Sequence, residues 1–99
     1  MFTNGLFFAW DERKNLINQR KHGVSFAEAR SVFLDKNATE YFDPDHSELE
    51  ERFILLGISD HLRVLAVSYC YRKNHAILRI ISARKANKTE EESYWRTAQ

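Results

Sequence analysis

Residues 52–86, RFILLGISDHLRVLAVSYCYRKNHAILRIISARKA, hold the pattern that determines the fold. Three apolar runs rich in β-branched and aromatic residues lie within this stretch, over residues 52–58, 64–71 and 77–83, and two short polar turns separate them. Runs of this length and composition are typical of strands, and strands joined by such short turns pair in antiparallel fashion. The middle run is apolar at both alternating sets of positions, which predicts a central strand covered on both faces.

The residues before this stretch predict a short strand and two helices. The apolar run at residues 6–10 is an expected edge strand, and Asp11 after it can cap a helix over residues 12–22. Gly23 ends that helix, because glycine tolerates the left-handed conformation found just past many helix C-termini. A Ser-x-x-Glu capping box then begins a second helix, over residues 26–34.

One more strand and a last helix complete the expected order. Residues 39–42 read as a strand that precedes an acidic loop, and a helix beginning at Thr89 has Glu92 as the partner in its capping box. The chain is therefore predicted to be a single α+β domain over residues 1–99: a short N-terminal strand, two helices, a four-stranded antiparallel meander and a C-terminal helix.

Composition limits the class of protein. A chain of 99 residues with 43% hydrophobic and 13% aromatic residues can bury one core, which excludes a disordered protein. The single cysteine, Cys70, stands in an apolar run, so we expect a buried free thiol and a reducing compartment. Neither a membrane-spanning run nor a signal peptide pattern is present, which favours a cytoplasmic protein without a membrane partner.

Charge is strongly segregated along the chain, although the formal net charge is only +1. Residues 61–88 contain no carboxylate, whereas residues 35–51 are acidic. The field at a ligand depends on the charges within a Debye length of roughly 8–10 Å, so a nearly neutral protein can still bind a polyanion locally. The cations of the basic stretch are Arg63, Arg72, Lys73, Arg79, Arg84, Lys85 and Lys88.

Two arginines of the last predicted strand are candidates for binding phosphate. A guanidinium held on a rigid sheet can bind a phosphate through two hydrogen bonds, whereas the structural alternative for Arg79 is a salt bridge to Glu50 or Glu51. Arg84 would point to the opposite face in a regular strand. Both arginines can serve one site only if a bulge or the strand end intervenes near Ser82.

Lys21 and His22, at the end of the first helix, are further candidates for functional residues. Positive charge there is favoured by the exposed helix carbonyls, which is the structural explanation. The functional explanation is that a neighbouring cation favours the neutral imidazole of His22, which could accept a proton.

The acidic loop offers only a weak metal site. Asp43, Asp45 and His46 are close in sequence, but sites for hard cations need more converging oxygens, and no spaced cysteine or histidine pairs suggest zinc. We therefore expect neither a metal nor another cofactor.

Four separated blocks of this sequence closely resemble the BrnT toxin family, in order and over nearly the whole chain. A set of four blocks is far more specific than any one of them. The blocks are FAWD at residues 8–11, KHGVSFAEA at residues 21–29, DPDHSE at residues 43–48 followed by ERF at residues 51–53, and RIISARKA at residues 79–86.

The resemblance implies a type II toxin with a fold like that of RelE-type ribonucleases, which cleaves RNA and inhibits translation. It further implies a BrnA-type antitoxin, a complex of two toxins with two antitoxins, and operator DNA recognition by the antitoxin alone. Carried over by position, the family pattern assigns catalysis to Lys21, His22, Arg79, Arg84 and a carboxylate at Glu51 or Glu50, and RNA contacts to Arg63, Arg72 and Lys85.

The expected chemistry is metal-independent RNA cleavage by the ribose 2′-hydroxyl, which needs a proton acceptor, a proton donor and cations near the phosphorus. In this hypothesis Arg79, Arg84 and Lys21 stabilise the transition state, Glu51 or His22 takes the 2′-hydroxyl proton, and all of these groups converge on one pocket. Two alternatives are a non-catalytic module that binds nucleic acid or protein through the basic sheet, and a metal-dependent hydrolase using the acidic loop.

Overall fold

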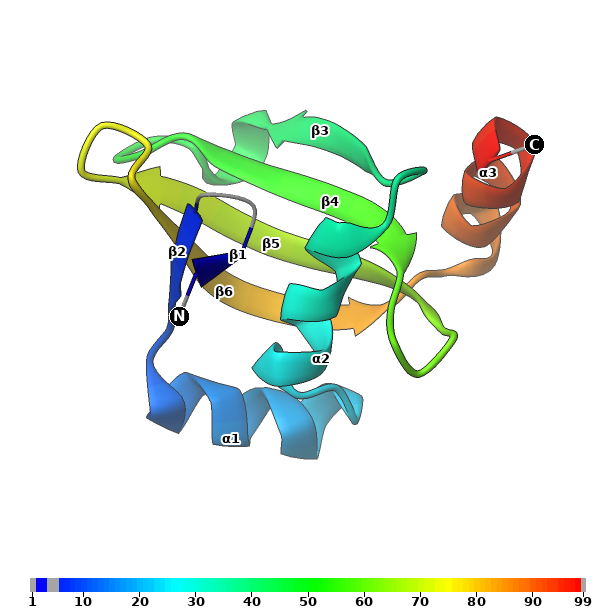
Figure 1. The fold of residues 1–99 in the computed structure, drawn as a ribbon, viewed down its shortest axis with the longest axis horizontal. Helices are drawn as coiled ribbons and strands as arrows, with labels where there is room; N and C mark the ends of the chain where they lie inside the picture. The colour runs from blue at the N-terminus through cyan, green and yellow to red at the C-terminus, as the bar shows by residue number, and fades with distance from the viewer. Residues whose placement is uncertain (1, 4–5, 99) are drawn as a thin grey trace.

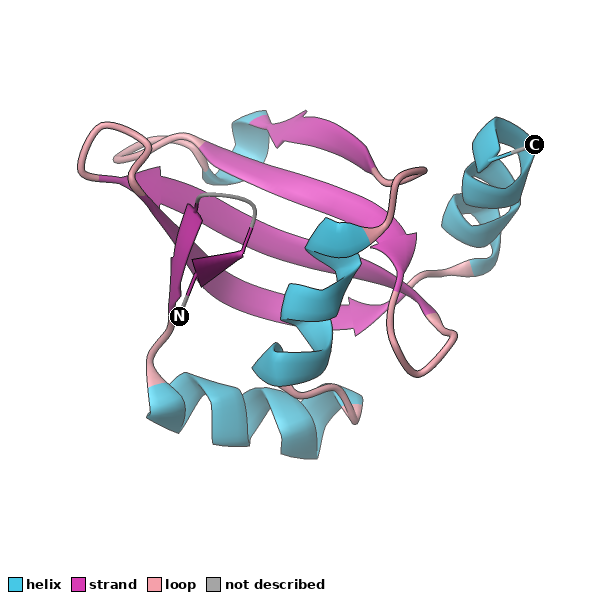
Figure 2. Ribbon diagram, viewed as in Figure 1, coloured by secondary structure: helices cyan, strands magenta, loops and turns pink. Residues whose placement is uncertain are grey.

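A single mixed sheet carries the three α-helices that the described chain forms (Figures 1 and 2). The computed structural model describes residues 2–3 and 6–98. The strands are β1 (Phe2–Thr3), β2 (Leu6–Ala9), β3 (Thr39–Asp43), β4 (Arg52–Ile58), β5 (Val64–Arg72) and β6 (Ile77–Lys85). The helices are α1 (Glu12–His22), α2 (Phe26–Ser31) and α3 (Lys88–Ala98), with short 3₁₀ turns η1 (Val32–Leu34) and η2 (Pro44–His46).

The sheet order is β1-β2-β6-β5-β4-β3, with β3 to β6 forming the predicted antiparallel meander. β2 pairs with β6 in parallel, and β1 pairs with β2 in antiparallel fashion. The prediction that the N-terminal apolar run is an edge strand is therefore wrong, because β1 covers its outer side. β3 lies at the opposite edge, and β5 lies inside the sheet as predicted.

Each face of the sheet has its own apolar cluster. On one face the larger core packs α2 and η1, through residues such as Phe26 and Val32, against Leu65, Val67 and Tyr69 of β5. On the other face a smaller cluster packs Tyr94 of α3 against β4 and β5. The hydroxyl of Tyr94 also donates to Asp35 Oδ2 at 2.6 Å, which ties α3 to the turn before β3.

Helix α1 is fixed by its caps and by buried amides. Asp11 accepts from the Arg13 N–H at 2.8 Å, and Gly23, with φ of 68°, ends the helix as predicted. Two asparagines are buried on the packed side of the helix. Asn18 donates to the carbonyls of Val24 and Ala83, each at 2.8 Å, and accepts from the Ala83 N–H, so the helix is hydrogen-bonded to β6.

The other two helices begin differently from their predicted capping boxes. Ser25 caps α2 by accepting from the Glu28 N–H at 3.0 Å, but the Glu28 carboxylate bonds elsewhere, as described below. At α3 the predicted box of Thr89 and Glu92 is wrong. Asn87 and Glu90 form it instead, each side chain accepting from the other's backbone N–H.

A bulge in β6 determines which side chains share a face. Ser68 pairs with Ser82 while Tyr69 pairs with Ile80, so Ile81 is an extra residue in β6. An extra residue reverses the alternation of side chains beyond it. Arg79 and Arg84 consequently lie on the same face of the sheet. From the sequence, the two arginines are predicted to share a site only if such a bulge is present.

None of the helices in residues 6–98 is both long enough and apolar enough to span a lipid bilayer.

Candidate anion-binding site

Two arginines flank the buried Cys70 on the face of the sheet that carries α3. Arg52 of β4 and Arg79 of β6 are both direct cross-strand partners of Cys70, and Asp43 of β3 is the partner of Arg52. Directly opposed residues on paired strands point to the same face. The two arginine backbones are separated by two strand spacings, or about 10 Å, so their long side chains can reach a common ligand.

Neither arginine has a carboxylate partner within the described chain. No Asp or Glu carboxylate of the described residues lies within ion-pair distance of Arg52 or Arg79. The Arg52 Nε is buried and has no hydrogen-bond acceptor among the described residues. A buried donor without a partner costs about 1–3 kcal/mol, so the Arg52 guanidinium keeps an unmet hydrogen bond among the described residues.

Arg72 completes the group, which we call the arginine cluster: Arg52, Arg72 and Arg79. Arg72 follows Cys70 by two residues and lies on the same face of β5. Contact with the Cys70 sulfur and the nearby Glu50 carboxylate raise the pKa of the Arg72 guanidinium. The Arg72 Nη2 lies 3.2 Å from Glu50 Oε1, so Glu50 partly neutralises one side of the cluster.

A histidine oriented by a carboxylate lies beside Arg52. His46 Nδ1 is 3.0 Å from Asp43 Oδ2, and with Nδ1 donating, Nε2 is left as an acceptor. His46, Glu50 and Arg52 line one pocket of about 340 Å³. The turn that carries His46 is tied to β4 because Ser47 Oγ accepts from the Arg52 N–H at 2.9 Å.

Arg84 shares the face of the arginine cluster but is occupied by α3. Its guanidinium donates to both carboxylate oxygens of Glu90, at 2.7 and 3.0 Å. This pair raises the pKa of Arg84 and lowers that of Glu90. Two of the five guanidinium N–H groups of Arg84 are thus used by Glu90 in this structure, and its role as a phosphate ligand stays a prediction.

A second charged group lies on the α2 side, where Glu28 is buried. Arg63 donates through Nε to Glu28 Oε2 at 3.0 Å and through Nη2 to the Gly23 carbonyl at 3.0 Å. Ser59 Oγ donates to the same Glu28 oxygen at 2.7 Å, and His61 Nδ1 lies 3.0 Å from the other. Burial raises the pKa of the Glu28 carboxyl, but the hydrogen bonds from Arg63 and Ser59 outweigh it, so the pKa lies below its ordinary value.

The remaining predicted residues do not join the arginine cluster. Lys21 and His22 lie at the end of α1 beside Gly23, and Lys85 is the cross-strand partner of Leu65, on the α2 face. Glu51 lines a different pocket, with Phe53 and Tyr71, whose rings pack on the larger core. The structure thus places these residues apart from the arginine cluster, and their predicted catalytic or RNA-binding roles stay predictions.

Sequence reasoning missed Arg52 and Glu28 as site residues, and weighed His46 only as a metal ligand. Arg52 carries the same charge as its predicted neighbours, but its place beside Arg79 depends on strand register. Among residues 2–3 and 6–98, no group of three or more His, Cys, Asp or Glu side chains is arranged to hold a metal ion. Asp43 and His46 thus form a hydrogen-bonded pair rather than part of a larger set of ligands.

Comparison with known proteins gives a family match and a structural match that agree. A family model described as "Ribonuclease toxin, BrnT, of type II toxin-antitoxin system" matches residues 10–90. The 1.1 Å crystal structure of the Brucella abortus ribonuclease toxin BrnT is similar in fold, with a TM-score of 0.61 and 25% sequence identity. That alignment covers 84% of this chain and 99% of the Brucella chain. A comparison with curated proteins gives no match.

Proposed function

Since this chain belongs to the family of BrnT ribonuclease toxins of type II toxin–antitoxin systems, we propose that it cleaves RNA at the arginine cluster without a metal ion. The observation that carries this proposal is the pair of arginines without carboxylate partners, Arg52 and Arg79, on one sheet face beside His46. Unpaired guanidinium groups on a rigid sheet are suited to bind the phosphate that reacts.

In the proposed reaction the ribose 2′-hydroxyl attacks the adjacent phosphorus. His46 Nε2 takes the hydroxyl proton, the O2′–P bond forms, the P–O5′ bond breaks, and solvent protonates the leaving 5′-oxygen. Arg52 and Arg79 stabilise the negative charge that builds on the phosphate oxygens. The products are a 2′,3′-cyclic phosphate and a 5′-hydroxyl, and Asp43 holds the imidazole in the required tautomer.

Glu50 replaces Glu51 as the carboxylate of this proposed site, because Glu50 bonds Arg72 and lines the pocket of His46. Lys21 and His22, which the family pattern predicts to be catalytic, lie at the end of α1 and are assigned in this proposal to RNA contacts beyond the scissile phosphate. Arg63 and Lys85 stay predicted RNA contacts.

The proposed cellular consequence is inhibition of translation in the cytoplasm, where cleavage of mRNA would stop protein synthesis. We propose a BrnA-type antitoxin as the neutralising partner, in a complex of two toxins and two antitoxins. The antitoxin would carry the contacts to operator DNA. Family membership supports an antitoxin partner, and the stoichiometry is tested by the mass of the purified complex in solution.

We expect purified toxin to cleave single-stranded RNA equally in EDTA and in magnesium, because protein cations alone stabilise the transition state. An RNA with 2′-O-methyl groups should bind but stay intact, since it lacks the nucleophile. Gel electrophoresis of end-labelled RNA measures both outcomes. Cleavage that EDTA abolishes and magnesium restores would favour the metal-dependent alternative, and retention of RNA without cleavage would favour a binding module.

A second prediction locates the base. His46→Gln should lower kcat about 10²-fold, the lower end of the usual contribution of general base catalysis. The matched control His22→Gln makes the same replacement of imidazole by amide at the end of α1. Its kcat should stay at the wild-type value. Single-turnover cleavage rates of both variants, over a range of pH, make this comparison. A larger loss for His22→Gln would place the base at the end of α1 instead.

A further inference from the structure

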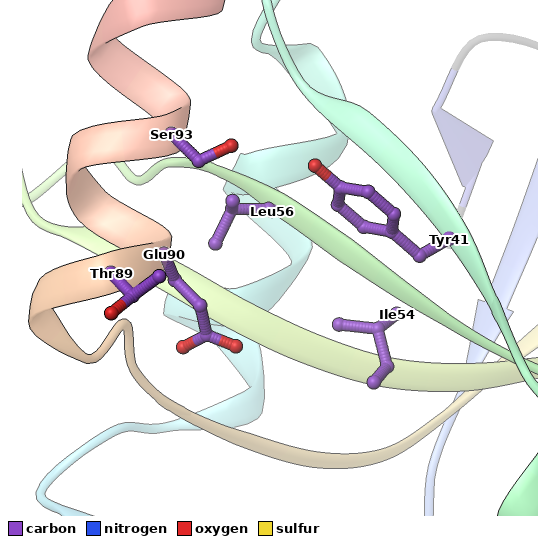
Figure 3. A pocket seen from close by; sticks show the side chains of 6 residues that line it. All are labelled: Tyr41, Ile54, Leu56, Thr89, Glu90 and Ser93. Atoms are coloured by element: carbon purple, nitrogen blue, oxygen red, sulfur yellow. The ribbon is translucent and has the colours of Figure 1, made fainter.

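An apolar groove separates α3 from strands β3 and β4 on the face of the arginine cluster. Figure 3 shows Ser93 of α3 across from Tyr41 of β3, with Leu56 between them and Ile54 below the Tyr41 ring. The groove has a volume of about 300 Å³ and is completed by Thr89 and Glu90 of α3. Tyr41 is 44% exposed and is the aromatic residue among those that line the groove.

The groove and the proposed catalytic site lie on the same face of β4. Arg52, Ile54 and Leu56 alternate along one face of β4, so the apolar floor of the groove and the first arginine belong to one strand. One step of this alternation is about 7 Å along the strand. A ligand segment of a few residues can therefore contact Leu56 and Ile54 and still reach the guanidinium of Arg52.

We propose that this groove is the docking site for an apolar segment of the antitoxin, whose neighbouring carboxylates cover the arginine cluster. The inference rests on the proposed function, because it assumes that the cluster is the site to be neutralised. Charge complementarity supports this occupant: Arg52 and Arg79 have no carboxylate of the described chain to pair with. Apolar anchors supply affinity and acidic residues supply specificity at such interfaces.

The two aromatic residues of the edge strand provide a matched test. Tyr41 and Phe42 are adjacent in β3 and similarly exposed, at 44% and 51%, but only Tyr41 lines the groove. Phe42 packs edge-on against Phe53, whose ring belongs to the larger core on the other face. Tyr41→Ser should weaken binding of purified BrnA-type antitoxin about 30-fold or more, as expected for a central aromatic anchor. Phe42→Ser should leave the affinity unchanged.

A second substitution alters the opposite wall of the groove, on α3. Ser93→Gln adds bulk on α3 without removing apolar surface from β3, and glutamine is at least as good a helix former as serine. It should weaken antitoxin binding in the same direction as Tyr41→Ser. Circular dichroism and thermal unfolding verify that each variant is folded.

Titration calorimetry of the full-length toxin with antitoxin decides the outcome. Wild-type affinity in both Tyr41→Ser and Ser93→Gln would overturn the proposal. An equal loss in Phe42→Ser would also overturn it, because it would indicate pairing along the β3 edge. RNA cleavage is measured separately, and Tyr41→Ser should retain it. A wild-type toxin that binds antitoxin through the groove but cleaves no RNA would refute the proposed function alone.

Discussion

Replacing Arg79 with alanine should lower the rate of RNA cleavage about 10²- to 10³-fold, the effect of removing one donor from a preorganised anion site. Arg79 has no carboxylate partner in the described chain, so its guanidinium is free for a phosphate. Arg79→Lys should recover only part of the loss, because an ammonium keeps the charge but not the two-pronged geometry. Single-turnover cleavage of a labelled RNA measures each variant.

Arg13→Ala on α1 is the control, since Arg13 is exposed and belongs to neither charged group. The double variant of Arg52 and Arg79 should lose less than the sum of the two single losses, because the residues act on one phosphate. Thermal unfolding should show that Arg79→Ala is folded. The variant should still bind antitoxin through the apolar groove, with a lower affinity because one cation of the arginine cluster is lost. A fully active Arg79→Ala would remove the arginine cluster from catalysis.

Replacing Glu28 with glutamine should lower the free energy of unfolding by about 3 kcal/mol, which is typical of breaking a buried ion pair by removing one partner. The Glu28 side chain is only 2% exposed and accepts from Arg63 and Ser59. Its loss leaves Arg63 without its counter-charge and releases the turn between β4 and β5 from α2. Urea unfolding at neutral pH measures the change.

The matched control is Glu91→Gln on α3, where the side chain is exposed and the free energy of unfolding should hardly change. The pH dependence gives a further check. The pKa of Glu28 in the folded protein lies below its ordinary value of 4.5, so its contribution is present above pH 4.5 and is lost as the pH falls through the folded value. The wild type and Glu28→Gln should therefore converge in stability under acid, and a constant difference would contradict the assignment.

Much of the fold follows from local sequence signals, because strands, turns and caps depend on neighbouring residues. The apolar residues at both alternating sets of positions in 64–71 identified the central strand, and Gly23 identified the end of α1. The position of β2 could not be predicted in this way. Its parallel pairing with β6 is a long-range contact, and nothing in the run at residues 6–10 distinguishes an edge strand from an interior one.

In the candidate site, too, the charges could be predicted from the sequence, whereas their positions depend on long-range contacts. The carboxylate-free basic stretch indicated Arg72 and Arg79, and both lie in the arginine cluster. Arg52 was not selected, because its position beside Arg79 depends on the register of three strands. Arg84 was selected for its charge, but its ion pair with Glu90 required knowing that α3 returns to the sheet. Charge can be counted in a sequence, whereas pairing of charges depends on tertiary structure.

The parallel pairing of β2 with β6 has a consequence for the biosynthesis of a toxin. Phe7 pairs with Ile77 and Ala9 with Arg79. β1 and β2 therefore cannot join the rest of the sheet until β6 has been synthesised. Arg79 itself lies in that last strand. A nascent chain therefore lacks the proposed catalytic surface until β6 has been synthesised.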